Sequence, residues 1–352
     1  MMPAPQKVFV AMSGGVDSST AAALLLKAGF NCAGIFMITN DHVQQAQADA
    51  EKVCRKLGIE LYVVDLRNDF EEIINYLCDE YAGGRTPNPC VRCNRVIKFG
   101  KLWEYAKVNG GGFIGTGHYA QVMKTGGQNG LYEAKEHAKD QSYVLSMIDR
   151  KMLDCIILPM GSYDKKTTRR LAGEFGLGVE EKEDSQEICF LTDGDYARLV
   201  ERRRPEIARS GKIVDMKGNV LGEHSGVYNY TIGQRRGLGI ALGQPAYVVK
   251  IDLSTNTVTL GNKKDLLSRR LRATAVNWLV DKPSGSFHAK VKIRYNHAGQ
   301  MAEVTPEDDS VIVEFKEPVS AITPGQAAVF YISENSYWRV AAGGWIDRTE
   351  RN

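Results

Sequence analysis

A short glycine-rich segment near the start of the chain has the residue types and the position expected of an anion-binding loop. Residues 13–18 read Ser-Gly-Gly-Val-Asp-Ser, directly after the apolar run 8–12 and before an Ala- and Leu-rich stretch. This order predicts a strand, a glycine turn and a helix start, where backbone N–H groups converge on an anion. The segment lacks the lysine with which common phosphate loops grip β and γ oxygens. It is suited to holding a pyrophosphate through backbone N–H groups and the hydroxyls of Ser13, Ser18 and Ser19.

The alternative interpretation of this segment is an ordinary tight turn before a helix, N-capped by Asp17 or Ser18. The Gly-Gly pair alone would favour that turn. The whole hexapeptide, placed between a strand and a helix, favours a nucleotide site instead. It resembles the PP-loop of ATP pyrophosphatases, enzymes that cleave ATP to AMP and pyrophosphate while adenylating an oxygen.

The cysteines form the second set of residues suited to chemistry. Residues 86–94 contain two prolines, which predict a loop, and a helix is predicted over residues 95–108. Arg92, Arg95 and the helix N-terminus beside Cys93 would lower the pKa of its thiol, which predicts a reactive thiolate. Cys189, between Ile188 and Phe190, would on its own be read as a buried core thiol. The remaining cysteines are most simply small core residues, namely Cys32, Cys54, Cys78 and Cys155.

Composition places the chain among globular proteins of more than one domain. The 352 residues are too many for one typical domain, and 43% hydrophobic with 25% charged residues is ordinary for a soluble protein. No apolar run is long enough to cross a bilayer, and residues 1–12 do not resemble a secretory signal. Seven cysteines without such a signal predict reduced thiols and a cytoplasmic protein, with no membrane partner.

Alternating strand and helix patterns in the first half predict an α/β domain with a mostly parallel sheet. Ligands of such sheets bind beyond the carboxyl ends of the strands, where Ser13, Met37 and Gly117 are expected. The predicted strands are residues 8–12, 32–38, 59–65 and 113–116, and the predicted helices are residues 43–57 and 70–81.

After residue 204 short alternating runs separated by turns predict small β-rich domains, the last a β-barrel. The predicted domains are 1–204, 205–270 and 271–352. The runs on which this rests are residues 212–215, 247–251, 257–260, 289–294, 311–315 and 327–331.

An ordered set of short motifs runs along nearly the whole chain. After residues 13–18 it comprises residues 34–37, 84–89, 93–94, 97–99, 116–119, 139–143, 184–185, 188–190, 230–239 and 323–326. Together these closely resemble the bacterial-type tRNA-specific 2-thiouridylases, members of the PP-loop ATP pyrophosphatase superfamily that thiolate the wobble uridine of certain tRNAs. The resemblance implies a PP-loop, adenine nucleotide alpha hydrolase-like catalytic domain.

The resemblance also implies a role for particular residues. Cys93 would be the catalytic nucleophile and Cys189 the persulfide carrier, with a transient disulfide between them and a sulfur relay protein donating the persulfide. The residues implied to contact ATP are Ala11, Met12, Ser13, Gly14, Gly15, Val16, Asp17, Ser18, Met37 and Gly117. Those implied to line the target base are Asn88, Pro89 and Cys90. Those implied to contact tRNA are His118, Lys139, Asp140, Gln141, Arg294, Tyr295 and Gln326, although His118, residues 139–141 and residues 294–295 could also be a turn, a solvated helix start and an exposed strand face.

Cys90 departs from the family pattern, which commonly has Asp at this position. Cys90, Cys93 and Cys189 offer three thiolates, the number that would hold a [4Fe–4S] cluster with one iron open to a sulfide. A structural zinc site is less attractive because it requires four ligands. The pair Cys90 and Cys93 could also be redox-active, or Cys90 could be inert. We favour the persulfide route over the cluster route, and both over zinc.

The net charge of +3 is small, so any nucleic-acid surface must come from local clusters of cations. Each cluster alone would be a solvated face, but together they cross all the predicted domains, which suits a large RNA held through phosphates. They are Lys165, Lys166, Arg169 and Arg170; Arg198, Arg202, Arg203, Arg204, Arg209 and Lys212; Arg235 and Arg236; Lys263, Lys264, Arg269 and Arg270; and Lys290, Lys292 and Arg294. Nearby Tyr228, Tyr230 and Tyr295 could stack on bases or belong to the β-domain cores.

The predicted reaction is ATP-dependent adenylation of the uridine C2 oxygen, followed by its replacement with persulfide sulfur from Cys189. Cys93 would attack either the persulfide or the activated base. Mg²⁺ would neutralise the triphosphate, and Asp17 is a candidate ligand for it. The alternative enzyme is an adenylating amide ligase on the same loop, which would need neither Cys93 nor Cys189. The non-enzymatic alternative is a tRNA-binding module with a vestigial nucleotide site.

Overall fold

The structure, a computed structural model, describes residues 6–183, 188–191, 195–240 and 243–350. The chain forms two compact units that we describe separately. The first comprises Met1–Glu72, Cys90–Phe190 and Ser333–Ala341, and the second comprises Ile73–Pro89, Leu191–Ile332 and Ala342–Asn352. The predicted boundaries of three domains remain a prediction.

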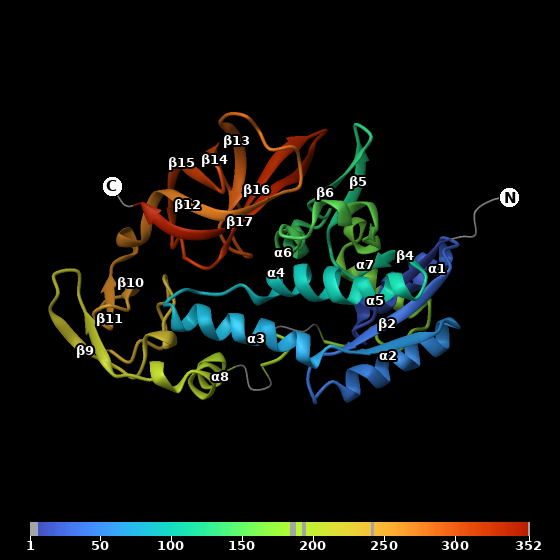
Figure 1. Cartoon of the computed structure of the whole chain (residues 1–352), viewed down its shortest axis with the longest axis horizontal. Helices are drawn as coiled ribbons and strands as arrows, with labels where there is room; N and C mark the ends of the chain where they lie inside the picture. Colours follow the sequence, from blue (N-terminus) through green and yellow to red (C-terminus); the bar gives the residue numbers. More distant parts are fainter. Residues whose placement is uncertain (1–5, 184–187, 192–194, 241–242, 351–352) are drawn as a thin grey trace. The chain divides into compact units, whose positions relative to one another are not determined.

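The first unit is built on a parallel sheet with strand order β3-β2-β1-β4-β7. Figure 1 labels β2 and β4 of this sheet. Its strands are β1 (Lys7–Ala11), β2 (Cys32–Ile38), β3 (Leu61–Asp65), β4 (Gly111–Gly115) and β7 (Ile156–Ile157). Its helices include α1 (Val16–Lys27), α2 (Gln44–Leu57), α5 (Leu102–Val108), α6 (Ser142–Leu145) and α7 (Lys165–Glu174), and it carries the hairpin β5 (Gln121–Thr125) and β6 (Gln128–Tyr132). The predicted α/β class and parallel sheet are confirmed.

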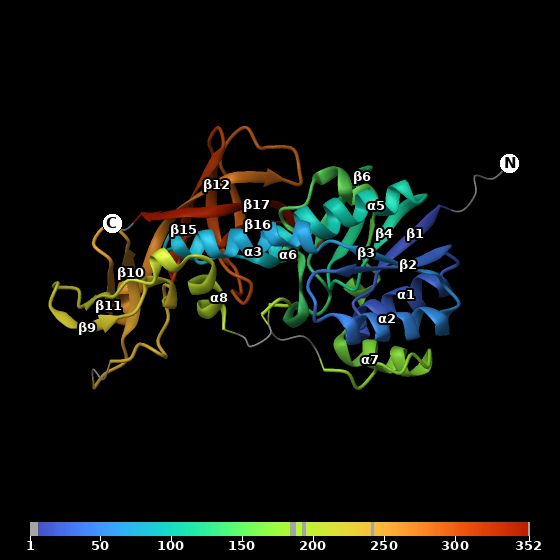
Figure 2. The same cartoon turned by 60° about the horizontal axis from the view of Figure 1, so that its bottom comes forward.

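Alternate residues of the central strand β1 pack against helices on opposite faces of this sheet. Val8 and Val10 join a buried cluster with residues of α1, α2 and α7. Phe9 points to the other face, where its ring lies 5.1 Å from that of Tyr62, and Tyr62 lies 6.5 Å from Tyr105 of α5. Figure 2 shows α1, α2 and α7 on one side of the sheet and α5 on the other. Helices on both faces explain why β1 is an uninterrupted apolar run.

The prediction of a loop over residues 86–94 is wrong for its second half. Pro89–Cys93 forms helix α4, which continues through a π-helical segment, Asn94–Lys101, into α5. Pro89 is compatible with this because proline lacks only an N–H that the first helical turn leaves unbonded in any case. Cys93 therefore lies inside a helical run and not before the start of a helix.

The second unit contains a small sheet of strand order β10-β11-β8-β9. Its strands are β8 (Gly211–Val214), β9 (Val220–His224), β10 (Tyr247–Asp252) and β11 (Thr257–Gly261). Tyr228 and Tyr230 are buried beside this sheet. Of the two alternatives for Tyr228 and Tyr230, a place in the protein core is confirmed, and their burial does not fit stacking on RNA bases.

The last six strands close into a barrel, as predicted, in the order β12-β15-β14-β13-β16-β17 with β12 pairing to β17. They are β12 (Leu267–Trp278), β13 (Phe287–Lys292), β14 (Gln300–Pro306), β15 (Ser310–Ser320), β16 (Ala327–Glu334) and β17 (Tyr337–Glu350). Alternate residues, among them Val311, Val313 and Phe315 of β15, fill its interior.

The remaining α-helices are α3 (Arg67–Ala82) and α8 (Tyr196–Arg203). In the part of the chain that the structure describes, no helix is long and apolar enough to cross a membrane.

Candidate functional site

The segment between β1 and α1 forms the predicted strand–turn–helix loop. Gly15 is the N-cap residue of α1, and no side chain caps the helix, so the interpretation of a turn N-capped by Asp17 or Ser18 is wrong. The serine hydroxyls fold the loop on itself: the Ser13 N–H donates to Ser18 Oγ at 3.1 Å, and Ser19 Oγ–H donates to the Gly15 carbonyl at 2.8 Å. The described residues thus provide no side-chain cap for the first N–H groups of α1, and such a helix start, at the positive end of the helix dipole, favours an anion.

Two glycines allow this loop its shape. Gly14 has φ +70°, and a Cβ added there would lie 2.4 Å from the Ala46 carbonyl oxygen of α2. Gly117 follows β4 and runs so close to α1 that a Cβ would lie 2.7 Å from the Ser18 nitrogen. Both glycines, predicted to contact ATP, are therefore required by backbone packing at the helix start. Of the other predicted ATP contacts, Ala11 ends β1, Met12 and Val16 are buried, and Met37 lies half-buried in β2.

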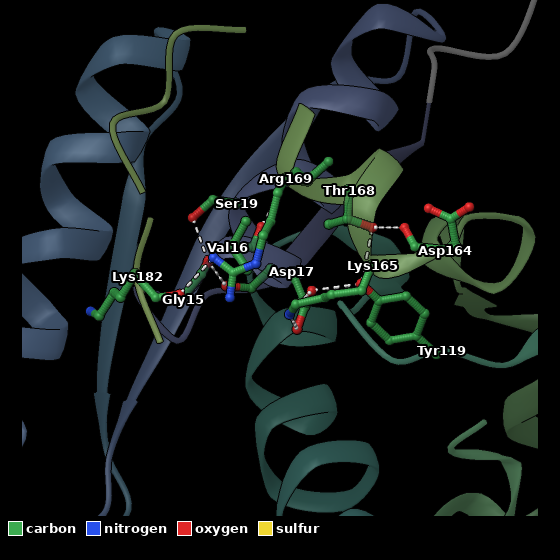
Figure 3. A network of polar contacts seen from close by, with 12 residues as sticks. Gly15, Val16, Asp17, Ser19, Tyr119, Asp164, Lys165, Thr168, Arg169 and Lys182 are labelled. Atoms are coloured by element: carbon green, nitrogen blue, oxygen red, sulfur yellow. Dashed lines mark hydrogen bonds and ion pairs between the residues drawn. The ribbon is translucent and has the colours of Figure 1, made fainter. Parts of the chain in front are cut away.

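Two lysines reach this loop from distant parts of the chain (Figure 3). Lys165 of α7 donates from Nζ to both carboxylate oxygens of Asp17, at 2.8 and 2.9 Å, and the Tyr119 hydroxyl donates to Asp17 Oδ1 at 2.8 Å. Lys182 donates to the Gly14 carbonyl at 3.0 Å and to Asp49 at 2.5 Å, which lowers the pKa of Asp49. Lys165 and Lys182, which are distant in sequence, thus bring to the loop the positive charge that its own sequence lacks.

Helix α7 is the element that positions these lysines. Asp164 caps it by accepting the Thr167 N–H at 2.6 Å, and the Tyr119 hydroxyl oxygen lies 2.9 Å from Thr168 Oγ1. Arg169 donates to the carbonyls of Glu180 and Lys182, which ties the Lys182 segment to the same helix. Lys165 and Arg169 were interpreted from the sequence as part of a surface cluster. Only 13% of the Lys165 side chain is exposed, so Lys165 is an ion-pair partner of Asp17 and not a solvated surface cation.

The three cysteines singled out in the sequence come together in the first unit. Cys93 is buried, whereas Cys90 and Cys189 are partly open to solvent, and all seven cysteines are free thiols. Burial raises the pKa of the Cys93 thiol to about 12, and the Lys98 charge opposes this shift while Cys189 and Cys90 add to it. The predicted low thiol pKa is therefore wrong for the isolated protein, because Cys93 is desolvated inside a helix. Of the predicted core thiols, Cys32, Cys54 and Cys78 are buried and Cys155 is half-buried.

His118 lies between Lys98 and Thr116. Its Nδ1 is 2.7 Å from Thr116 Oγ1 and its Nε2 is 3.5 Å from Lys98 Nζ. Burial, with the Lys98 charge beside it, lowers the pKa of His118 well below its usual value, so the imidazole is neutral. Both ring nitrogens of this predicted tRNA contact are thus engaged within the protein.

Several other residues predicted to contact tRNA also have internal partners. Asp140 is buried, and its carboxylate accepts the N–H groups of Ala134 at 3.0 Å and Ser142 at 3.1 Å. Gln141 accepts the Tyr119 N–H at 2.9 Å, while Lys139 is half-buried. In the barrel, Arg294 donates to the Ser320 carbonyl at 3.1 Å and Tyr295 is 39% exposed. Contact with tRNA remains a prediction for all of these residues.

Gln326 holds the segment that leads into the predicted base-binding residues. Its Nε2 donates to the carbonyls of Thr86 at 3.2 Å and Pro87 at 2.8 Å, all within the second unit. Asn88 follows, buried, with its N–H 3.4 Å from the Tyr76 hydroxyl. Pro89 then opens α4 and Cys90 lies in its first turn. Gln326 therefore holds this segment by two hydrogen bonds, and its contact with tRNA remains a prediction.

The donor sets do not fit a preformed metal centre. Across residues 6–183, 188–191, 195–240 and 243–350, no group of three or more His, Cys, Asp or Glu side chains is arranged to hold a metal ion. A [4Fe–4S] cluster on Cys90, Cys93 and Cys189 remains a prediction, because each of these thiols would bind a different iron and not a common ion. Both oxygens of Asp17 accept hydrogen bonds from Lys165, so this carboxylate is not an open ligand for Mg²⁺.

A parallel sheet whose first strand leads through a Ser-Gly-Gly-Val-Asp-Ser loop into an uncapped helix defines a nucleotide-using protein of the PP-loop ATP pyrophosphatase class. Three family models match the chain in order: the tRNA methyl transferase HUP domain over residues 6–193, the tRNA methyl transferase PRC-barrel domain over 199–262, and the aminomethyltransferase beta-barrel domain over 268–346.

Full-length relatives sharpen this assignment. The chain is 43% identical to the tRNA-specific 2-thiouridylase MnmA of Syntrophotalea carbinolica, covering 96% of this chain and 98% of the relative. It is 45% identical to that of Rickettsia typhi, covering 98% and 99%, and 44% identical to that of Carboxydothermus hydrogenoformans, covering 97% and 98%. The chain belongs to the family of tRNA-specific 2-thiouridylases.

Proposed function

We propose that this protein is a tRNA-uridine 2-sulfurtransferase that converts the wobble uridine of tRNA to 2-thiouridine at the expense of ATP. The observation that carries the proposal is the position of residues 116–118. Gly117 packs on the first turn of α1 at the nucleotide loop, while His118 lies against Lys98 beside the thiols. This short segment supports a site in which nucleotide and sulfur chemistry act on one substrate.

In the first half-reaction the C2 oxygen of uridine attacks the α-phosphorus of ATP and displaces pyrophosphate. The N–H groups at the start of α1 and the Lys165 and Lys182 ammonium groups are placed to stabilise the departing negative charge. Lys165 can serve the phosphates only by exchanging Asp17 for them. Mg²⁺ is proposed to arrive with the triphosphate, and no step depends on a site for it in the protein.

In the second half-reaction a relay protein's persulfide gives its outer sulfur to the Cys189 thiolate and leaves as a thiolate. The Cys189 persulfide then attacks C2, and AMP departs with the original oxygen. The Cys93 thiolate attacks the Cys189 sulfur, and the bond between that sulfur and the sulfur on C2 breaks. The electron pair of this bond stays on the C2 sulfur, which gives 2-thiouridine. The resulting disulfide between Cys93 and Cys189 is reset by a thiol reductant. Family membership favours this reaction over the amide ligase and over a non-catalytic tRNA-binding module.

The direct test is pyrophosphate release from ATP by the full chain with and without unmodified tRNA. We expect release that depends on tRNA, with one AMP formed for each adenylated uridine. Adding a protein persulfide donor should then yield 2-thiouridine in nuclease digests of the tRNA, detected by mass spectrometry. Pyrophosphate release that does not require tRNA would point to another acceptor, and absence of release would support the tRNA-binding module.

We further propose that the barrel contributes to tRNA binding through Arg294 and Tyr295. The double replacement by alanine should weaken tRNA binding by about tenfold or more and reduce the salt dependence by about one counterion, because a phosphate contact is lost. Binding isotherms at several salt concentrations measure both effects. Tyr337→Ala, which removes another exposed tyrosine, is the matched control and should bind normally. Unchanged affinity and salt slope in the double variant would exclude this role.

A further inference from the structure

The π-helical segment Asn94–Lys101 carries Lys98, whose charge acts on the Cys93 thiol. Cys93 is the residue that leads into this segment, and Lys98 follows it by five positions. A π-helix bonds each residue to the fifth along the chain, so its wider turn brings Lys98 to the same face as Cys93. In a regular α-helix the fourth residue would occupy that place. Segments of this kind are often found at functional sites.

Lys98 is half-buried, and no carboxylate of the described residues neutralises its charge. Over the described part of the chain it forms no ion pair, and its hydrogen-bond partner is His118. An ammonium group can only donate, so His118 Nε2 must accept and Nδ1 must carry the proton that faces Thr116. The neutral imidazole therefore orients the ammonium without cancelling its charge.

The charge of Lys98 acts on all three thiols of the site. Burial raises the pKa of Cys90, Cys93 and Cys189, even though Cys90 and Cys189 are partly open to solvent, and in each case Lys98 is the cation that lowers it. The other groups that act on Cys93 are the sulfurs of Cys189 and Cys90, which raise its pKa. The sequence pointed to Arg92 and Arg95 instead, but Arg95 is exposed to solvent.

We propose that the Lys98 ammonium stabilises the anionic sulfur of Cys93 and Cys189 during sulfur transfer, and that His118 and Thr116 are the positioning residues that hold it there. This inference deepens the proposed function and rests on it for the identity of the reaction. Because Gly117 packs against α1 between Thr116 and His118, the support of Lys98 is anchored at the nucleotide loop. His118 then acts on the thiols through Lys98, and its contact with tRNA remains a separate prediction.

Alkylation of the free protein tests this inference without ATP, tRNA or a sulfur donor. The full chain is treated near neutral pH with neutral iodoacetamide or with anionic iodoacetate, and the three cysteines are followed separately by peptide mass spectrometry. Lys98→Met and Lys98→Gln should slow iodoacetamide at Cys189 and Cys93 by about tenfold, the effect of one pKa unit on the thiolate population. Iodoacetate should slow further, because its own attraction to the ammonium is also lost.

The ratio of the two alkylation rates separates charge from structure. A change in access to the thiols would alter both reagents equally, whereas loss of the Lys98 charge lowers the iodoacetate rate relative to iodoacetamide. Lys98→Arg keeps the charge and should restore most of the rate and the ratio. Lys101→Met is the matched control, since Lys101 lies in the same π-helical segment but pairs with Asp69 at 3.5 Å. It should react as the wild type does.

The inference fails if Lys98→Met and Lys98→Gln leave the ratio unchanged, or if Lys98→Arg does not restore it. Activity assays distinguish this failure from failure of the proposed function. Lys98→Met should retain tRNA binding and tRNA-dependent pyrophosphate release while losing thiolation. If wild-type protein releases no pyrophosphate with tRNA, the proposed function fails. The alkylation rates would still test, independently, whether the Lys98 charge acts on the thiols. Loss of tRNA affinity in Lys98→Met with normal alkylation would make Lys98 an RNA contact and overturn the inference.

Discussion

Cys93→Ser and Cys189→Ser should each lower tRNA thiolation by about a thousandfold or more while leaving tRNA-dependent pyrophosphate release in place. A serine hydroxyl can neither carry a sulfane sulfur nor attack one at neutral pH, so loss of either thiol breaks the transfer. Adenylation requires neither sulfur atom, so ATP turnover should continue and end in hydrolysis of the activated base. Mass spectrometry of digested tRNA measures the first effect, and a pyrophosphate assay on the same samples measures the second.

Replacement of core cysteines provides the control for this prediction. Cys32 is buried and its pKa is raised to about 11 by that burial, so it is protonated and enclosed at neutral pH. Cys32→Ser and Cys155→Ser should affect the free energy of unfolding at most, with thiolation close to wild type. Full thiolation by Cys93→Ser in the same assay would contradict both the persulfide and the cluster mechanisms.

Cys90→Ser discriminates between those two mechanisms. If sulfur passes as a persulfide, Cys93 and Cys189 suffice and Cys90→Ser should keep substantial activity. If three thiolates held a cluster, Cys90→Ser should lose iron and activity together, because a hydroxyl is a poor ligand for such a site. Iron-free protein that thiolates tRNA from a persulfide donor would decide for the persulfide route.

Local patterns predicted the sheet and its loop well because both are set by neighbouring residues. The apolar run before Ser13 became β1, and the predicted strand over residues 32–38 coincides with β2. The predicted helix over residues 43–57 corresponds to α2, and Gly58, the next residue, is the left-handed C-cap of α2. In each case the period of apolar residues and the position of a glycine carry the information, and no distant contact is needed.

The residues that sequence reasoning missed are those brought in by tertiary structure. Lys165 and Lys182 are 148 and 168 residues from their partners Asp17 and Gly14, so no local spacing could reveal them. The one indication of these lysines in the sequence was an absence: a phosphate-binding loop without its own lysine needs a cation from another part of the chain. The error at Cys93 has another cause, since the pKa prediction weighed neighbouring charges but not the burial that dominates them.

Gly14→Ala should reduce tRNA-dependent pyrophosphate release by about a hundredfold or more with the fold retained. The left-handed backbone at φ +70° costs alanine about 1–2 kcal/mol. The added Cβ would also lie 2.4 Å from the Ala46 carbonyl, a contact that only movement of the loop can relieve. Such a movement takes the Gly14 carbonyl away from Lys182 and misplaces the N–H groups that bind the phosphates.

The matched control for Gly14 lies just beyond the other end of α1. Gly29 has φ +87°, but a Cβ there would meet nothing within 4 Å, so Gly29→Ala carries the conformational cost without the collision. Gly14→Ala should lose at least as much free energy of unfolding as Gly29→Ala in denaturant titrations, and only Gly14→Ala should lose ATP turnover. Binding of tRNA should persist in both, since the loop is assigned to the nucleotide. If Gly14→Ala releases pyrophosphate at the rate of Gly29→Ala, the loop between β1 and α1 does not hold the phosphates of ATP, and the nucleotide site must be sought elsewhere in the first unit.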